Sequence, residues 1–383
     1  MHNLRYIFTL LMLCTLFVSC RKSDADVSEN QFTETIYRPE YASGFSIRRI
    51  PGKAGILITS TNPWQGADSL SCSLFIAPDG EMPPQGFKGQ VLDKEAKRIV
   101  TMSSTNIAML DVLGETDRIC GVSGMRFISN PRIRQRAGEI GDVGYDGNTN
   151  YELLLSLRPD LVLLYGVDGA NPIEGKLKEL GIPYVYIGDY MEESPLGKAE
   201  WIVPIATIIG DMQKGIETFR PIPQRYNRLK GMVANLQDKN RPGILVNAPY
   251  AGSWFMPTSE SYSGRLIIDA GGRLLSANNG RATALPVDME EAYRMASEAD
   301  LWINPGTASS LSALRHMCPK YADTPCLRDG KVYNNNLCSN PEGGNDYFES
   351  GIMHPDLVLS DLIKIFHPDL RPEEPFHYYR RLE

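Results

Sequence analysis

Short apolar runs alternate with helical segments between residues 98 and 187, and this alternation limits the fold more than any other feature of the chain. The β-rich runs are 98–102, 118–122, 160–165 and 184–187. The run 160–165 (DLVLLY) is apolar without interruption after its first residue, which is typical of a parallel strand buried on both faces. Since strands that alternate with helices form parallel sheets covered by helices, we predict an α/β lobe here.

Residues that begin or end helices stand at the boundaries of the intervening segments. Ser104 or Thr105 can cap the first helix, Asn150 can cap the second, and Gly181 can end the third. The boundary residues therefore support the same alternation of strands and helices.

The alternation resumes after Pro242, beyond a helical segment at 195–238 that has no strand pattern. Further strands are expected at 243–246 and 299–303, and further helices from Ser259 or Thr258 to Ile268, from Asp288, and over 357–366. We therefore predict two Rossmann-like α/β lobes joined by a long helical connector. Pro221 and Pro223 interrupt this connector, and a proline in a helix interior costs about 3 kcal/mol. We expect either two helices that meet near Arg220 or one helix kinked there.

The chain begins with the features of an exported lipoprotein. Arg5 precedes an apolar run at 7–18, which has the length of a signal-peptide core and is too short to span a bilayer. The run ends at 16–20 (LFVSC), which resembles a bacterial lipoprotein box. We predict that Cys20 is acylated and that the mature protein is anchored to the membrane, facing the periplasm. The alternative is an ordinary secretory signal with an incidental cysteine.

Strand patterns at 44–47, 55–59 and 71–76, with a turn at 62–66, predict a small β extension before the first lobe; its role is open. The predicted division of the chain is a signal peptide at 1–20, a tether and β extension at 21–94, the first lobe at 95–194, the connector at 195–240 and the second lobe at 241–383.

Charge and cysteine content exclude some classes of function. The formal net charge of −7 argues against nucleic acid as a partner, since phosphate binding needs a basic surface. One disulfide among Cys318, Cys326 and Cys338 is compatible with an oxidising compartment, although the connectivity of these and of Cys72 and Cys120 stays open. His316 beside the last three cysteines has no C-x-x-C spacing, so we predict no metal site there.

Several segments carry a family resemblance. The opening 98–103 and 118–122, the run 141–144, and above all 150–162 (NYELLLSLRPDLV) resemble the periplasmic iron-siderophore and cobalamin substrate-binding proteins. Residues 270–272 and 288–303 resemble the second lobe of that family, so the resemblance covers about 95–365. It implies a ligand clamped between two lobes and delivered to an ATP-driven (ABC) permease. The family has a continuous connector helix, and the prolines of this chain depart from that pattern.

The loops that follow the strands are the candidate ligand site, because ligands of open α/β sheets bind beyond the carboxyl ends of the strands. Aromatic residues there suit a large planar or catecholate ligand, and arginines suit its anionic oxygens. The candidates are Arg126, Phe127, Tyr145, Tyr165, Tyr250, Trp254 and Arg281. The alternative is that the aromatic residues pack in the protein and the arginines are solvated.

Glu152 and Glu290 lie in the first turn of a predicted helix, one in each lobe. The resemblance implies that such glutamates dock on basic residues of the permease. The alternative is a favourable charge at a helix N-terminus, which needs no partner.

The predicted ligand is a metal chelate, either a ferric siderophore, haem or cobalamin, and the sequence does not distinguish among them. A bare ion is not expected, since few histidines are present and most of them lie near the C-terminus. We find no nucleophile elbow and no phosphate-binding glycine motif, so we predict a binding protein with no cofactor and no catalytic residues. The competing classes are an enzyme, such as a chelatase, or a sensor with the same fold.

Overall fold

The computed structural model describes residues 28–145, 147–250, 252–276, 284–371 and 373–383. The predicted signal peptide, the acylation site Cys20 and the tether to residue 27 lie outside the described residues. Among the described helices, none has the length and apolar character that crossing a bilayer needs.

The first lobe is a parallel five-stranded sheet in the order β10-β9-β6-β7-β8. Its strands are β6 (Ile99–Thr101), β7 (Ile119–Val122), β8 (Gly141–Asp142), β9 (Leu161–Leu164) and β10 (Tyr184–Tyr186). Its helices are α3 (Ser104–Val112), α4 (Pro131–Gln135), α5 (Tyr151–Ser156) and α6 (Glu174–Leu180). Every residue of β9 is buried, as the uninterrupted apolar run predicts. The predicted α/β lobe is confirmed.

The first-lobe helices begin close to where the sequence places them. Asn150 caps α5 as predicted, because its side chain accepts a hydrogen bond from the Leu153 amide at 2.9 Å. For α3 the prediction is wrong by one residue: Ser103 is the cap, and its hydroxyl accepts from the Thr105 amide. Ser103 has an extended backbone that places its side chain over the first turn, whereas Ser104 is already helical.

The second lobe repeats this architecture with a sheet in the order β13-β11-β15-β16-β17, in which only the last pair is antiparallel. Its strands are β11 (Gly243–Val246), β13 (Arg273–Leu274), β15 (Leu301–Ile303), β16 (Val332–Asn334) and β17 (Arg380–Arg381), with a separate pair, β12 (Trp254–Met256) and β14 (Leu285–Val287). Its helices are α11 (Tyr262–Asp269), α12 (Met289–Glu298), α13 (Leu311–Met317), α14 (Pro325–Arg328) and α15 (Pro355–Phe366). Asp288 caps α12 as predicted. The cap of α11 is Ser261 and not Ser259 or Thr258, because residues 258–261 first form a turn in which the Thr258 carbonyl accepts from Ser261.

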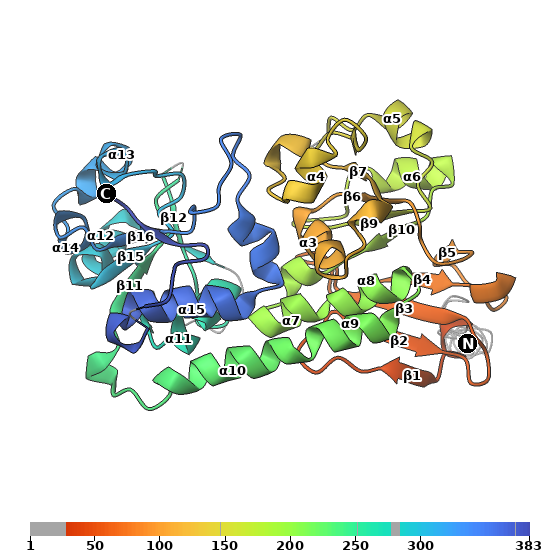
Figure 1. Cartoon of the computed structure of the whole chain (residues 1–383), viewed down its shortest axis with the longest axis horizontal. Coiled ribbons are helices and arrows are strands. Elements are labelled where there is room, and N and C mark those ends of the chain that lie inside the picture. The colour runs from red at the N-terminus through yellow and green to blue at the C-terminus, as the bar shows by residue number, and fades with distance from the viewer. Residues whose placement is uncertain (1–27, 146, 251, 277–283, 372) are drawn as a thin grey trace, which may run out of the picture.

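The connector consists of α7 (Pro195–Glu200), α8 (Ile202–Ile208), α9 (Met212–Phe219) and α10 (Pro221–Val233). Of the two arrangements expected, the structure has two helices that meet at Arg220, and α9 and α10 lie nearly end to end along one side of the molecule (Figure 1). Arg220 itself has helical backbone angles, φ −44° and ψ −43°. Pro221 and Pro223 fall in the first turn of α10, where a backbone N–H has no partner within its own helix, so their missing donors cost little.

The β extension is a five-stranded sheet in the order β1-β2-β3-β4-β5. Its strands are β1 (Glu34–Tyr37), β2 (Phe45–Arg49), β3 (Ile56–Thr61), β4 (Ser71–Ile76) and β5 (Gln90–Leu92). The three predicted strands are confirmed, and the short β1 and β5 are additions. The sheet lies beside the first lobe and α8 (Figure 1).

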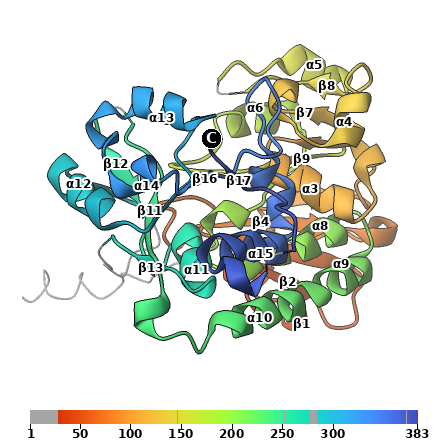
Figure 2. The ribbon, with the colours of Figure 1, turned by 60° about the vertical axis from the view of Figure 1, so that its left-hand side comes forward.

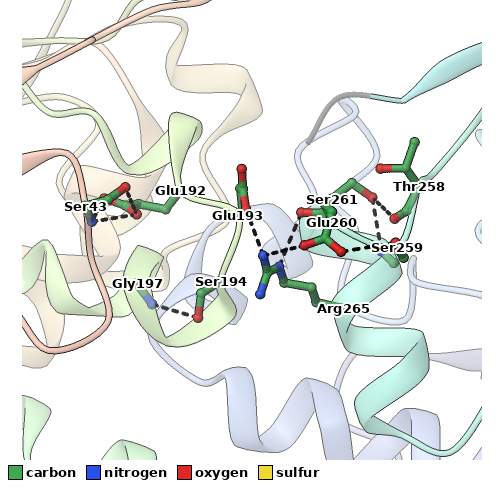
Figure 3. Close-up of polar contacts among 11 residues, drawn as sticks. Ser43, Glu192, Glu193, Ser194, Gly197, Thr258, Ser259, Glu260, Ser261 and Arg265 are labelled. Carbon is green, nitrogen blue, oxygen red and sulfur yellow. Dashed lines mark hydrogen bonds and ion pairs between the residues drawn. The ribbon is translucent and has the colours of Figure 1, made fainter. Parts of the chain in front are cut away.

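Two buried carboxylates from the connector region hold residues 40–44 of the extension. The Glu200 carboxylate accepts hydrogen bonds from the amides of Glu40, Tyr41 and Ala42 at 2.7–2.8 Å, and also from the Tyr37 hydroxyl. The Glu192 carboxylate accepts from Ser43 and from the amide of Gly44, and Figure 3 shows it pointing at Ser43. Because Glu200 is fully buried, these donors satisfy a charge that has no contact with water.

We expect Glu200→Ala to lower the free energy of unfolding by about 3 kcal/mol, because it removes the acceptor shared by three backbone amides and the Tyr37 hydroxyl. Urea denaturation followed by circular dichroism measures the change. The control is Glu217→Ala on the exposed side of α9, which should alter stability by less than about 0.5 kcal/mol. Equal effects of the two substitutions would contradict the role of Glu200.

Candidate functional site

The loops after the parallel strands form the candidate site. In the second lobe β11 and β15 are each followed by an asparagine with positive φ, Asn247 at 65° and Asn304 at 55°. A left-handed residue turns the chain sharply as it leaves the sheet, and asparagine tolerates this conformation better than most residues. Asn247 is fixed there because its side chain donates to the Phe255 carbonyl and its own carbonyl accepts from Trp302.

Three of the predicted ligand-binding residues lie together in the first lobe. The Arg126 guanidinium is 4.4 Å from the ring centre of Phe127 and 5.4 Å from that of Tyr145, and it donates to the Tyr145 hydroxyl. The two rings meet edge to face at 5.2 Å. The Asp142 carboxylate accepts from the amides of Gly124 and Met125 and so fixes the loop that carries Arg126. The cluster presents a cation and aromatic surface that is partly exposed.

The other predicted ligand-binding residues are dispersed. Tyr165 follows β9 and is half-buried, and Tyr250 follows β11 with 80% of its surface exposed. Arg281 lies outside the described residues. Trp254 is fully buried, its indole N–H donates to the Val246 carbonyl, and its ring packs against Tyr321 at 4.9 Å. This placement corrects the prediction for Trp254, because a side chain enclosed in the core and already hydrogen-bonded has no free face for a ligand.

A segment of the second lobe that the sequence did not single out reaches the first lobe. This strap (residues 335–354) stands between the two lobes (Figure 1). Its Asn340 side chain donates to the carbonyls of Arg126 and Ile128 at 3.0 and 3.1 Å. Its Glu349 carboxylate accepts from the amides of Ser129 and Asn130, both at 2.8 Å. The strap therefore binds the backbone on which the Arg126 cluster is built.

A second set of contacts joins the lobes beside the connector. Arg265 of α11 lies 2.8 Å from both Glu193, at the start of the connector, and Glu260 of its own lobe. Figure 2 shows the position of α11 in the whole molecule, and Figure 3 shows Glu192 directed at Ser43 and Glu193 paired with Arg265. All three side chains of the ion-pair network are partly exposed, so it orients the lobes more than it stabilises them.

Glu152 and Glu290 are both exposed, in the first turns of α5 and α12. No ion pair of either carboxylate is found within the described residues. By contrast Glu291, one residue further, is paired with Arg294 at 2.7 Å.

The described residues offer no group of three His, Cys, Asp or Glu side chains placed to hold a metal ion. The five described cysteines are free thiols: Cys318 and Cys326 are buried, and Cys338 is exposed and donates to the His377 carbonyl. Two hollows lie away from the candidate site. One of about 370 Å³ lies between α10 and α15, and one of about 530 Å³ lies at the amino ends of the second-lobe strands.

Comparison with known proteins identifies similar chains. A sequence model of a family described as periplasmic binding protein matches residues 99–335, which is more than half of the chain. An uncharacterized lipoprotein of Methanocaldococcus jannaschii is 28% identical over 303 residues, covering 76% of this chain and 70% of the relative. A periplasmic heme-binding protein from Pseudomonas aeruginosa has a TM-score of 0.55 at 19% identity, covering 71% of this chain and 93% of that one. The periplasmic vitamin B12-binding protein of Vibrio cholerae has a TM-score of 0.51 at 16% identity, covering 72% and 98%. At such low identities the two solved structures show a shared two-lobed fold.

The Glu349 contact between the lobes makes stability depend on pH. Burial raises the pKa of Glu349 to about 7, although the amides of Ser129 and Asn130 oppose the shift. Between pH 4.5 and 7 the folded protein therefore keeps a proton that the unfolded chain loses, so the contribution of Glu349 to stability falls as pH rises. The loss over this range is on the order of 3 kcal/mol and is complete above pH 7.

We expect Glu349→Gln, which does not titrate, to gain stability relative to the wild type as pH rises from 4.5 to 7.5. Urea denaturation of both proteins across this range measures the difference, in which other titrating groups cancel. Glu342→Gln, an exposed substitution in the same strap, is the control and should alter stability by less than about 0.5 kcal/mol. A difference for Glu349→Gln that is constant with pH would refute the assignment.

Proposed function

This chain belongs to the periplasmic binding protein family, and from that premise we propose that it captures a metal chelate between its two lobes and delivers it to an ATP-driven importer. The fold it shares with heme- and vitamin B12-binding proteins of the periplasm supports this proposal. The family and these structures are binding proteins, which favours binding over catalysis. The chelate is a ferric siderophore, haem or cobalamin.

The observation that carries the proposal is the cluster of Arg126, Phe127 and Tyr145 beyond the carboxyl ends of the first-lobe strands. A guanidinium can bind carboxylate or catecholate oxygens, while the rings can contact the flat face of a macrocycle. Tyr165 and the exposed Tyr250 are proposed as further contacts, one from each lobe. Trp254 is left out because it is buried.

We propose that Glu152 and Glu290 dock the loaded protein on basic residues of the permease. Their exposure and their lack of an ion pair among the described residues leave both carboxylates available to a partner. Acylation of Cys20 would anchor the protein to a membrane, and a lipoprotein of similar sequence supports that anchor.

We expect the wild type to bind at least one of haemin, cyanocobalamin or a ferric siderophore at micromolar affinity or better, and to give no saturable heat with zinc or manganese in calorimetry. Arg126→Ala and Tyr145→Ala should each weaken chelate binding about tenfold, or about 1.4 kcal/mol. Arg132→Ala, an exposed arginine of the same lobe, is the control and should leave affinity unchanged. Tight zinc binding without chelate binding would refute the proposal.

We expect the double substitution Glu152→Lys and Glu290→Lys to leave chelate affinity and melting temperature nearly unchanged and to reduce uptake into vesicles that contain the permease. The reduction should be greater at low salt, because exposed charges act mainly on encounter and orientation. The control with the same charge change is Glu217→Lys on α9 and Asp238→Lys in the turn that follows α10. Wild-type uptake by the first variant would show that the two glutamates are only helix-end charges.

A further inference from the structure

The β extension is attached to the edge of the first-lobe sheet. β10 is the edge strand of that sheet, and the Ser60 hydroxyl at the end of β3 donates to the Tyr186 carbonyl at 2.5 Å. The ring of Trp64, in the turn between β3 and β4, lies 5.0 Å from the ring of Tyr186. The extension therefore packs beside the edge strand β10 of the first lobe, and it lies outside the segment 99–335 that matches the family.

The turn at residues 62–66 extends past the carboxyl ends of β9 and β10. The Gln65 amide donates to the Val167 carbonyl at 2.8 Å, and the Gln65 side chain donates to the Tyr190 hydroxyl at 3.3 Å. Val167 follows β9 and Tyr190 follows β10. Gly166 permits this close approach, because a Cβ at that position would lie 2.8 Å from the Cβ of Trp64. The turn thus lies at the sheet edge where this fold binds ligands.

Tyr190 connects this corner to the second lobe. It is 46% exposed, and the Lys198 ammonium lies 5.7 Å from its ring and 5.2 Å from the ring of Tyr262 in α11. The carbonyls of Asp189 and Tyr190 accept hydrogen bonds from this ammonium, which fixes its position. The surface formed by Trp64, Gln65 and Tyr190 therefore borders the junction of the two lobes.

Trp64 differs from the other tryptophans of the chain. Trp201, Trp254 and Trp302 are fully buried, whereas Trp64 is partly exposed, and no hydrogen bond of its indole N–H is found within the described residues. An indole, a phenol and a primary amide side by side suit a ligand with a flat aromatic face and polar substituents at its rim.

We propose that Trp64 and Gln65 of the β extension, together with Tyr190, form one wall of the ligand site and help to select a planar or catecholate metal chelate. This inference rests on the proposed function. It assigns the extension to substrate recognition and adds contacts that the family-matched segment does not contain.

Calorimetry with haemin, cyanocobalamin and a ferric tris-catecholate tests the wall. We expect Gln65→Ala and Tyr190→Ala each to lower the affinity for the chelate that the wild type binds by about tenfold, which is roughly the effect of one lost contact. Gln65→Ala keeps the backbone bond to Val167, so the turn should retain its position. Met82→Ala, an 81% exposed residue elsewhere in the extension, should bind as the wild type does. Melting temperatures identify any variant that has lost its fold.

Acrylamide quenching of tryptophan fluorescence gives a second measurement. The bound chelate should protect Trp64 from acrylamide, and Trp64→Phe should abolish this protection while a folded protein remains. If both the Gln65 and Tyr190 variants bind with wild-type affinity and Trp64 is not protected, the proposed wall is wrong, while the proposed function is unaffected. A wild type that binds none of the three chelates overturns the proposed function and the wall with it.

Discussion

Buried carboxylates that accept backbone N–H groups hold the irregular segments of this protein in place. Glu200 and Glu192 bind residues 40–44, Glu349 binds Ser129 and Asn130, and Asp361 of α15 binds the amides of residues 377–379. A carboxylate offers several acceptor positions and can satisfy successive amides that have no partner in a helix or sheet. The cost of burying the charge is offset only while all of these bonds are formed, so each clamp acts as a unit.

The hydrogen bonds of these buried carboxylates join parts of the molecule that are far apart in the sequence. The extension is bound to the connector region through Glu192 and Glu200, and the two lobes are bound to each other through the strap and through Arg265. Any separation of the lobes has to break the Glu349 contact or carry residues 129–130 with it. The adjacent residues Glu192 and Glu193 contact different parts of the molecule. Glu192 binds Ser43 of the extension, and Glu193 pairs with Arg265 of the second lobe (Figure 3).

The sequence predicts the regular elements well because their signals are local. The apolar run in β9, the Asn150 cap of α5 and the prolines after Arg220 each act within a few residues. The candidate site is predicted in part. The position of Arg126, Phe127 and Tyr145 after the strands of the first lobe could be predicted from the order of strands and helices. Trp254 also follows a predicted strand, but it is buried because β12 pairs with β14 over the second-lobe core. The strap and the carboxylate clamps leave no sequence pattern, since their partners are backbone groups far away along the chain.

The spacing of the clamps also sets the order in which the chain can become structured. Residues 37–42 precede their acceptor Glu200 by 158 to 163 positions, and Ser129 precedes Glu349 by 220. Contacts of such high sequence separation form slowly, because closing a long loop costs entropy before any bond repays it. A chain that is synthesised from its N-terminus contains the whole β extension long before Glu200 is added. Residues 37–42 therefore lack the acceptor that holds them until every strand of the first lobe has been made.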